Sequence, residues 1–177
     1  MGRTFPGALS GAHLAVQSER DYKRRAMRLE FFSPQNLTFD HVKVLTHALF
    51  AVAKVDGVHD NEMALIREFY ESCTRAENPP LEDVAGGTFD IESAKALFDT
   101  DDTKKLFLKS LILLAFADGK YATVEDEIIR EYGAALGLGE DEVNNLHEAT
   151  KEYLLSSLAH IQNLDALKEV RKRLDPH

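Results

Sequence analysis

The chain has 177 residues and a formal net charge of −9, and 44% of its residues are hydrophobic. A chain of this length fits one domain with its own core, and no apolar run approaches the roughly 20 residues that a transmembrane helix needs. The acidic balance argues against a general nucleic-acid binder, because such proteins need cationic surface to neutralise phosphates.

The first 35 residues differ in charge from the rest of the chain. They contain six Lys or Arg and three Asp or Glu, and residues 13–32 follow a helical pattern that stops at Ser33-Pro34. We therefore divide the chain into a basic N-terminal arm, residues 1–35, and a helical domain, residues 36–177. A solvated helix face is the commoner use of such an arm, but it could also pack on the acidic body or contact an acidic partner or a membrane surface.

Two features favour a cytoplasmic location. The N-terminus lacks the contiguous apolar region of a signal peptide. The single cysteine, Cys73, cannot form an internal disulfide, which fits a reducing compartment. Cys73 continues an apolar helical stripe, so we interpret it as a core residue rather than a nucleophile.

Helical periodicity continues through the rest of the chain. The expected helices cover residues 38–57, 60–73, 90–98, 99–117, 123–136, 140–160 and 164–174, with at most a short turn within 81–90. The expected N-caps include Thr38, Asp60, Asp90 and Thr123, and the expected glycine stops include Gly57 and Gly137. Residues 106–117 are apolar on nearly every face, which is typical of a helix at the centre of a bundle. No segment shows sustained period-two alternation, so we predict an all-α fold of seven or eight helices around one core.

Two stretches of the chain have the same pattern. Residues 49–57, LFAVAKVDG, recur 62 positions later as residues 111–119, LILLAFADG. After the Asp-Gly pair the second copy contains one extra residue. When this extra residue is allowed for, Glu125 aligns with Glu62. Each copy is an apolar run, an Asp-Gly break, a short acidic loop and a second amphipathic run. A duplicated helix–loop–helix unit can bring two acidic loops together by pseudo-symmetry.

The repeated Ala-x-Val/Ala-Asp-Gly, followed by a loop and a glutamate, resembles the core motif of the tellurite-resistance TerB family. The resemblance covers about residues 38–160. It implies a compact helical bundle of two similar halves whose acidic loops bind a divalent metal. The family includes bacterial stand-alone proteins and a domain of a membrane-anchored J-domain co-chaperone. This chain departs from the motif at Met63, where a second glutamate is usual, and its second loop is one residue longer than its first.

Four carboxylates are the candidate metal ligands: Asp56, Glu62, Asp118 and Glu125. Such oxygen ligands suit hard cations, so calcium, magnesium or manganese would be the natural ion. The same residues fit a role without metal, because Asp-Gly makes a tight turn and an acidic residue in the first helical turn complements the helix dipole. The second role is the commoner one in proteins, and the two are compatible.

Other chemistry has little support in the sequence. His59 lies in the first acidic loop and could add a nitrogen ligand, although a lone loop histidine is more often a bystander. His147 has no carboxylate partner at ligand spacing, which argues against zinc. The chain also lacks a glycine-rich phosphate loop and a Gly-x-Ser-x-Gly elbow.

We therefore expect a non-enzymatic TerB-like module for stress response or protein interaction. Its acidic loops would bind either a divalent cation or a basic protein segment. The alternative is a structural scaffold without metal that binds a protein partner through the N-terminal basic helix or the last helix. Neither the partner nor the oligomeric state can be inferred from these patterns.

Overall fold

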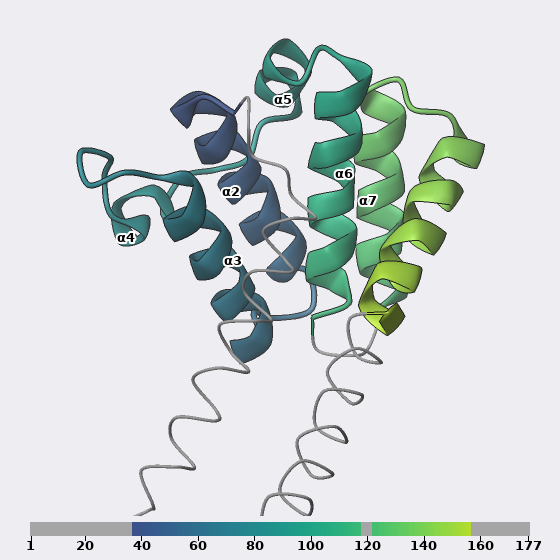
Figure 1. Cartoon of the computed structure of the whole chain (residues 1–177), viewed down its shortest axis with the longest axis horizontal. Helices are drawn as coiled ribbons and strands as arrows, with labels where there is room; N and C mark the ends of the chain where they lie inside the picture. Colours follow the sequence, from purple (N-terminus) through teal and green to yellow (C-terminus); the bar gives the residue numbers. More distant parts are fainter. Residues whose placement is uncertain (1–36, 118–121, 157–177) are drawn as a thin grey trace, which may run out of the picture.

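The computed structural model describes residues 37–117 and 122–156, and every regular element in these two ranges is a helix (Figure 1). The elements are α2 (Phe39–Ala53), α3 (Asp60–Cys73), α4 (Leu81–Val84), α5 (Ile91–Leu97), α6 (Asp101–Ala115) and α7 (Thr123–Ala135). Residues 140–156 form a further helix. The expected all-α architecture is confirmed for this part of the chain. The helices expected over 13–32 and 164–174 lie outside it.

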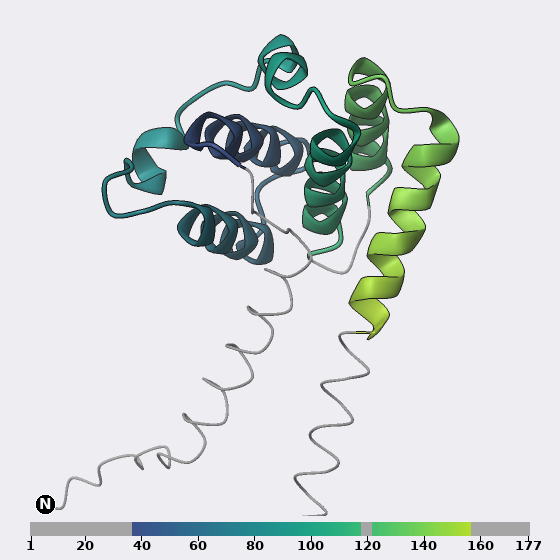
Figure 2. The ribbon, with the colours of Figure 1, turned by 45° about the horizontal axis from the view of Figure 1, so that its top comes forward.

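Helix α6 is the centre of the bundle. Its buried residues are Phe107, Leu108, Ser110, Leu111, Ile112, Leu113, Leu114 and Ala115. It packs against α2, α3 and α7, and Figures 1 and 2 show it between α2 and α7. Each fully buried Leu, Ile or Phe side chain contributes about 1.5–3 kcal/mol relative to an exposed one. The central position expected for residues 106–117 is confirmed.

Several helix ends follow the sequence signals. The Thr38 side chain caps α2, and the Asp90 side chain caps α5. Gly137 has a φ of 80° and directly follows Leu136, the C-cap of α7, as expected for a glycine that ends a helix in the left-handed conformation. Gly57 also has a positive φ, 105°, but it lies beyond Lys54, the C-cap of α2. It therefore shapes the turn to α3 rather than ending α2.

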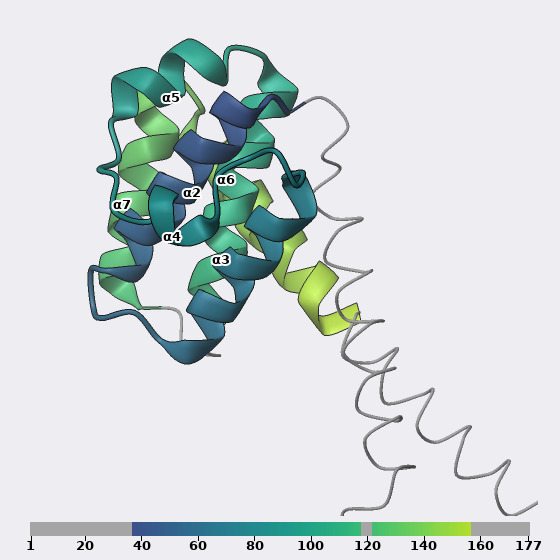
Figure 3. The ribbon, with the colours of Figure 1, turned by 90° about the vertical axis from the view of Figure 1, so that its left-hand side faces the viewer.

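The two ends of the bundle differ. Helices α2 and α6 run in one direction and α3 and α7 run back, so the α2–α3 turn lies at the same end as the last turn of α6 and the first turn of α7 (Figures 1 and 3). Residues 152–156 reach this end as well. We call it the loop end and define it as residues 54–62, 116–117, 122–127 and 152–156. Helix α5 lies at the opposite end, where it packs on α2 and α7.

Two histidines of α2 hold the short helices in place. His41 Nε2 donates to the carbonyl oxygen of Leu97 at 2.9 Å, at the end of α5. His47 Nε2 donates to the carbonyl oxygen of Val84 at 3.0 Å, at the end of α4. Both carbonyls lie at the end of a short helix, and the Val84 carbonyl also accepts from the backbone N–H of Gly87 at 3.0 Å. The two histidines are six residues apart on α2, so their rings contact different helices.

Gly87 offers a test of the contact between α2 and α4. A Cβ at this position would overlap the His47 ring, so Gly87→Ala must displace the ring from Val84. We expect the free energy of unfolding to fall by about 1–3 kcal/mol, as measured by urea denaturation. Gly86→Ala is the matched control, because its Cβ would meet nothing within 4 Å. In a His47→Ala chain the Gly87 substitution should cost far less, and an equal cost there would contradict the explanation.

Candidate functional site at the loop end

Glu62 and Glu125 have the same position at the start of α3 and α7. Each is the third residue of its helix, and each is only 2% exposed. Glu62 Oε2 accepts a hydrogen bond from the backbone N–H of His59 at 2.7 Å. Glu125 Oε2 accepts one from the N–H of Ala122 at 3.1 Å. Both carboxylates thus satisfy a backbone donor at a helix start, as in half of a capping box.

The N-caps of these two helices differ from the expected ones. Asp60 and Thr123 are the first helical residues, and the N-caps are His59 and Ala122, neither of which makes a side-chain cap hydrogen bond. Both helices therefore start one residue earlier than N-caps at Asp60 and Thr123 would imply. The reason is that the backbone N–H of the actual N-cap residue bonds forward to a glutamate at the N3 position. Glu62 and Glu125 therefore both lie at N3 of their helices, whereas N-caps at Asp60 and Thr123 would have placed both at N2.

The structure places three of the four expected metal ligands at the loop end. Asp56 lies in the turn after α2, and its Oδ2 atom is 4.0 Å from Nε2 of His59. Asp118 lies outside the described residues. Within 37–117 and 122–156, no group of three or more His, Cys, Asp or Glu side chains is arranged to hold one metal ion. Asp56, Glu62 and Glu125 therefore share one end of the bundle without forming such a group by themselves.

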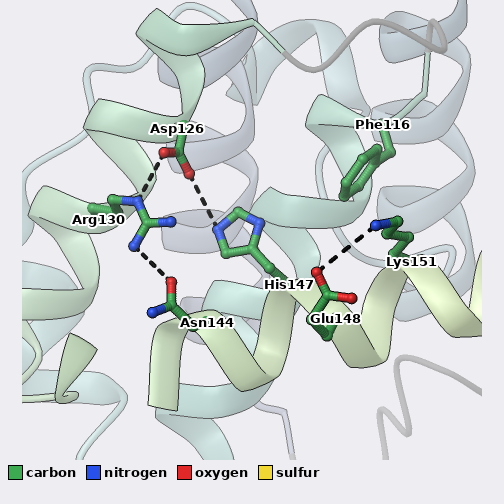
Figure 4. A pocket seen from close by; sticks show the side chains of 7 residues that line it. All are labelled: Phe116, Asp126, Arg130, Asn144, His147, Glu148 and Lys151. Atoms are coloured by element: carbon green, nitrogen blue, oxygen red, sulfur yellow. Dashed lines mark hydrogen bonds and ion pairs between the residues drawn. The ribbon is translucent and has the colours of Figure 1, made fainter. Parts of the chain in front are cut away.

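A second set of polar side chains joins α7 to the helix at residues 140–156 (Figure 4). Asp126 is at its centre. Its Oδ2 accepts from Nε of Arg130 at 2.8 Å, and its Oδ1 lies 3.4 Å from Nε2 of His147. Arg130 Nη1 also donates to Oδ1 of Asn144 at 2.9 Å. Two residues of α7 are thereby linked to two residues of the next helix, which fixes how the helices face each other.

These side chains line a pocket of about 380 Å³ whose wall also includes Phe116, Glu148 and Lys151. Figure 4 shows Lys151 directed toward Glu148, with Nζ 3.8 Å from Oε1. The wall contains two carboxylates, Asp126 and Glu148, and two cationic groups, Arg130 and Lys151, so their charges largely compensate. His147 has the carboxylate partner that a general base needs, but no Ser, Thr or Cys lines the pocket. Catalysis through a Ser, Thr or Cys nucleophile therefore has no candidate in its wall.

Sequence reasoning missed this network. Asp126 and Arg130 have the i, i+4 spacing of a helical ion pair, which was a visible signal. His147 lies on the following helix, and nothing in the local sequence pairs it with Asp126. The structure thus gives His147 the carboxylate partner that its sequence neighbours do not supply.

Burial determines the protonation of His147. Its side chain is 12% exposed, and desolvation lowers its pKa below the ordinary value of 6.5. Asp126 opposes this shift, and Arg130 adds to it. The neutral imidazole is therefore favoured in the folded protein, because charging a buried ring costs free energy.

The loop end also carries exposed apolar side chains. Four large hydrophobic residues of the described chain are exposed, and all four lie at this end: Val55 at 37%, Val58 at 41%, Val124 at 43% and Leu155 at 59%. They come from the turn after α2, the first turn of α7 and the end of the helix at 140–156. Scattered exposed hydrophobics are ordinary on a protein surface, whereas these four all lie at one end of the domain.

No family model matches the chain, and no curated protein or solved structure is significantly similar to it. Within residues 37–117 and 122–156, none of the helices has both the length and the apolar character to cross a membrane. The geometry of the loop end is therefore the basis for the functional argument.

His147 makes a pH dependence testable. The unfolded chain takes up a proton on this residue more readily than the folded chain, so the free energy of unfolding should fall as the pH drops through 6.5 and below. Burial lowers the pKa of His47 in the same direction. Urea denaturation between about pH 8 and pH 5 should give a shallower slope for His147→Gln, and a still shallower one with His47→Gln added. Equal slopes for wild type and His147→Gln would contradict this account.

Proposed function

We propose that this chain is a TerB-like, non-enzymatic interaction domain that binds a basic amphipathic protein segment at its loop end. The observation that carries the proposal is the exposure of Val55, Val58, Val124 and Leu155 at this one end. In this proposal α2–α3 and α6–α7 are two copies of one helix–turn–helix unit. The shared N3 position of Glu62 and Glu125, and the turns at one end of the bundle, support that duplication.

The charge around these side chains specifies the kind of segment. The exposed acidic residues of the loop end are Asp56, Asp60, Glu127 and Glu152. Lys54 is the one Lys or Arg within the four ranges that define this end. An apolar surface rimmed by carboxylates complements a helix with an apolar stripe and Lys or Arg beside it. Such complementarity speeds association and is weakened by salt.

A synthetic peptide tests this proposal. The probe is a helix-forming peptide with leucines along one face and lysines on the others, titrated into the full chain and followed by methyl NMR. We expect shifts at Val55, Val58 and Val124. Val58→Ser with Val124→Ser should weaken binding by about tenfold, because apolar area is removed from the contact. Added salt should weaken binding too.

Two controls make the result specific. A peptide of the same composition with its leucines scattered should bind weakly, since it presents no stripe. Glu77→Gln, an exposed position away from the loop end, should leave the affinity unchanged. Equal binding by both peptides, or methyl shifts elsewhere on the domain, would overturn the proposal.

A second candidate function is binding of a divalent cation at the loop end. It is favoured by the arrangement in Figure 3, where the turn after α2, which contains Asp56, lies at the same end of the bundle as the first turns of α3 and α7, which contain Glu62 and Glu125. Asp118 would supply the fourth carboxylate. A carboxylate has two oxygens, so capping through one of them is compatible with ion binding. Calcium, magnesium and manganese are the cations that such ligands suit.

Calorimetry tests the cation site separately. Titration of the metal-stripped protein with calcium, magnesium and manganese should give saturable binding with at least one ion. Asp56→Asn together with Asp118→Asn should abolish it, because two charged ligands are lost. Asp83→Asn, an exposed change on α4, is the matched control and should bind as wild type does. A flat titration would overturn the cation site alone.

A further inference from the structure

A second pocket lies between α2 and the segment that contains α4, which packs on α2 (Figure 3). Its volume is about 400 Å³, at the lower end of the roughly 300–1,000 Å³ usual for small-molecule sites. Residues of α2 that share one helix face, four positions apart, form one wall: Phe39, Lys43 and His47. The opposite wall includes Pro79, Asp83 and Val84. None of these residues belongs to the loop end, so the pocket is separate from the surface of the proposed function.

Hydrogen bonds hold the two walls of this pocket together. His47 on α2 donates to the carbonyl oxygen of Val84 at 3.0 Å. The Tyr70 hydroxyl donates to the carbonyl oxygen of Pro79 at 2.6 Å. The backbone at Gly87 approaches the His47 ring so closely that a Cβ there would overlap it. The folded chain therefore forms the pocket by itself, as is usual for small-molecule sites.

Two opposite charges line this pocket, one from each wall. Lys43 lies on α2 and Asp83 on α4, and both residues are exposed. Neither side chain forms an ion pair or a hydrogen bond with another residue in the part of the chain that the structure describes. A cation and an anion in one pocket that do not pair with each other can each pair with the opposite charge of a ligand. A zwitterion supplies both of these charges in one small molecule.

Rings make up much of the remaining lining. Phe39, His47 and Pro79 each contribute a ring, and Val84 adds an aliphatic surface. Burial lowers the pKa of His47, so its ring is neutral near pH 7 and adds no second cation. Aromatic groups pack well against such walls, because flat rings gain both apolar contact and favourable ring–ring geometry.

We propose that this pocket binds a free α-amino acid with an aromatic side chain. The Lys43 ammonium pairs with the carboxylate of the ligand, and the Asp83 carboxylate pairs with its ammonium. The ring of the ligand packs against Phe39 and Pro79. Because such a ligand contacts both α2 and the α4 segment, it also stabilises the folded chain by mass action.

Calorimetric titration of the full chain with L-phenylalanine tests the site. We expect saturable binding of one ligand per chain. Lys43→Gln and Asp83→Asn should each weaken it by about tenfold, because each removes one charge-assisted contact. Lys54→Gln and Glu77→Gln, which change exposed charges outside the pocket, should bind as wild type does. A titration without saturable binding would overturn the proposal.

Two analogues separate a free amino acid from the end of a peptide. L-Phenylalaninamide lacks the carboxylate, as does the first residue of a peptide, so it should bind more weakly and Lys43→Gln should weaken it no further. N-Acetyl-L-phenylalanine lacks the ammonium, as does the last residue of a peptide, so Asp83→Asn should weaken it no further. If either analogue binds wild type as tightly as L-phenylalanine does, one charge is sufficient and the proposal fails.

Two further measurements test the ring contact and the location. L-Alanine has both charges and no ring, so it should bind at least about tenfold more weakly than L-phenylalanine. Methyl NMR with L-phenylalanine should shift the signals of Val84 and leave those of Val55 and Val124 in place. Shifts at the loop-end valines instead of Val84 would contradict the assignment. The basic peptide reports on the loop end and the amino acid on this pocket, so either proposal can fail without the other.

Discussion

The burial of α6 is the constraint on which the rest of this structure depends. From Phe107 to Ala115, Lys109 is the one residue that is not buried. A helix that is apolar all round needs neighbours on every side, because its exposed alternative would leave a large apolar area in water. Helices α2, α3 and α7 supply those neighbours. Covering α6 in this way places the α2–α3 turn, the last turn of α6 and the first turn of α7 at one end of the bundle, and these segments make the loop end.

The starts of α3 and α7 depend on buried carboxylates. Burying a carboxylate is costly unless hydrogen bonds replace its hydration. Glu62 and Glu125 each receive one such bond from the backbone N–H before the helix. They therefore contribute to folding whatever else they bind. The pattern of an Asp-Gly break followed by a glutamate does not distinguish a helix-capping residue from a metal ligand, because both roles need a carboxylate at the start of a helix.

The sequence predicted the features that local patterns determine. The central position of α6 followed from its apolar composition, and the caps at Thr38 and Asp90 followed from their side chains. The starts of α3 and α7 were misplaced by one residue, because their N-cap N–H groups bond to buried glutamates rather than to a polar N-cap side chain.

Contacts between distant residues could not be predicted in this way. His41 and His47 bond to backbone carbonyls of α5 and α4, whose positions depend on the packed fold. The contact between Asp126 and His147 joins two consecutive helices, and no residue spacing within either helix indicates it. Helical periodicity assigns a residue to a face of its own helix, but the partner that covers that face is set by the packing of the whole bundle.

The two ends of the bundle differ in how their apolar side chains are covered. At the far end α5 packs on α2 and α7, and Ala94 and Phe98 are fully buried there. At the loop end, none of the described helices covers Val55, Val58 and Val124. Glycine and aspartate in a turn would satisfy the backbone without any apolar side chain, so the reversal itself does not require these valines. Exposed apolar residues beside exposed carboxylates are therefore the feature of this end on which the proposed binding of a basic amphipathic segment rests.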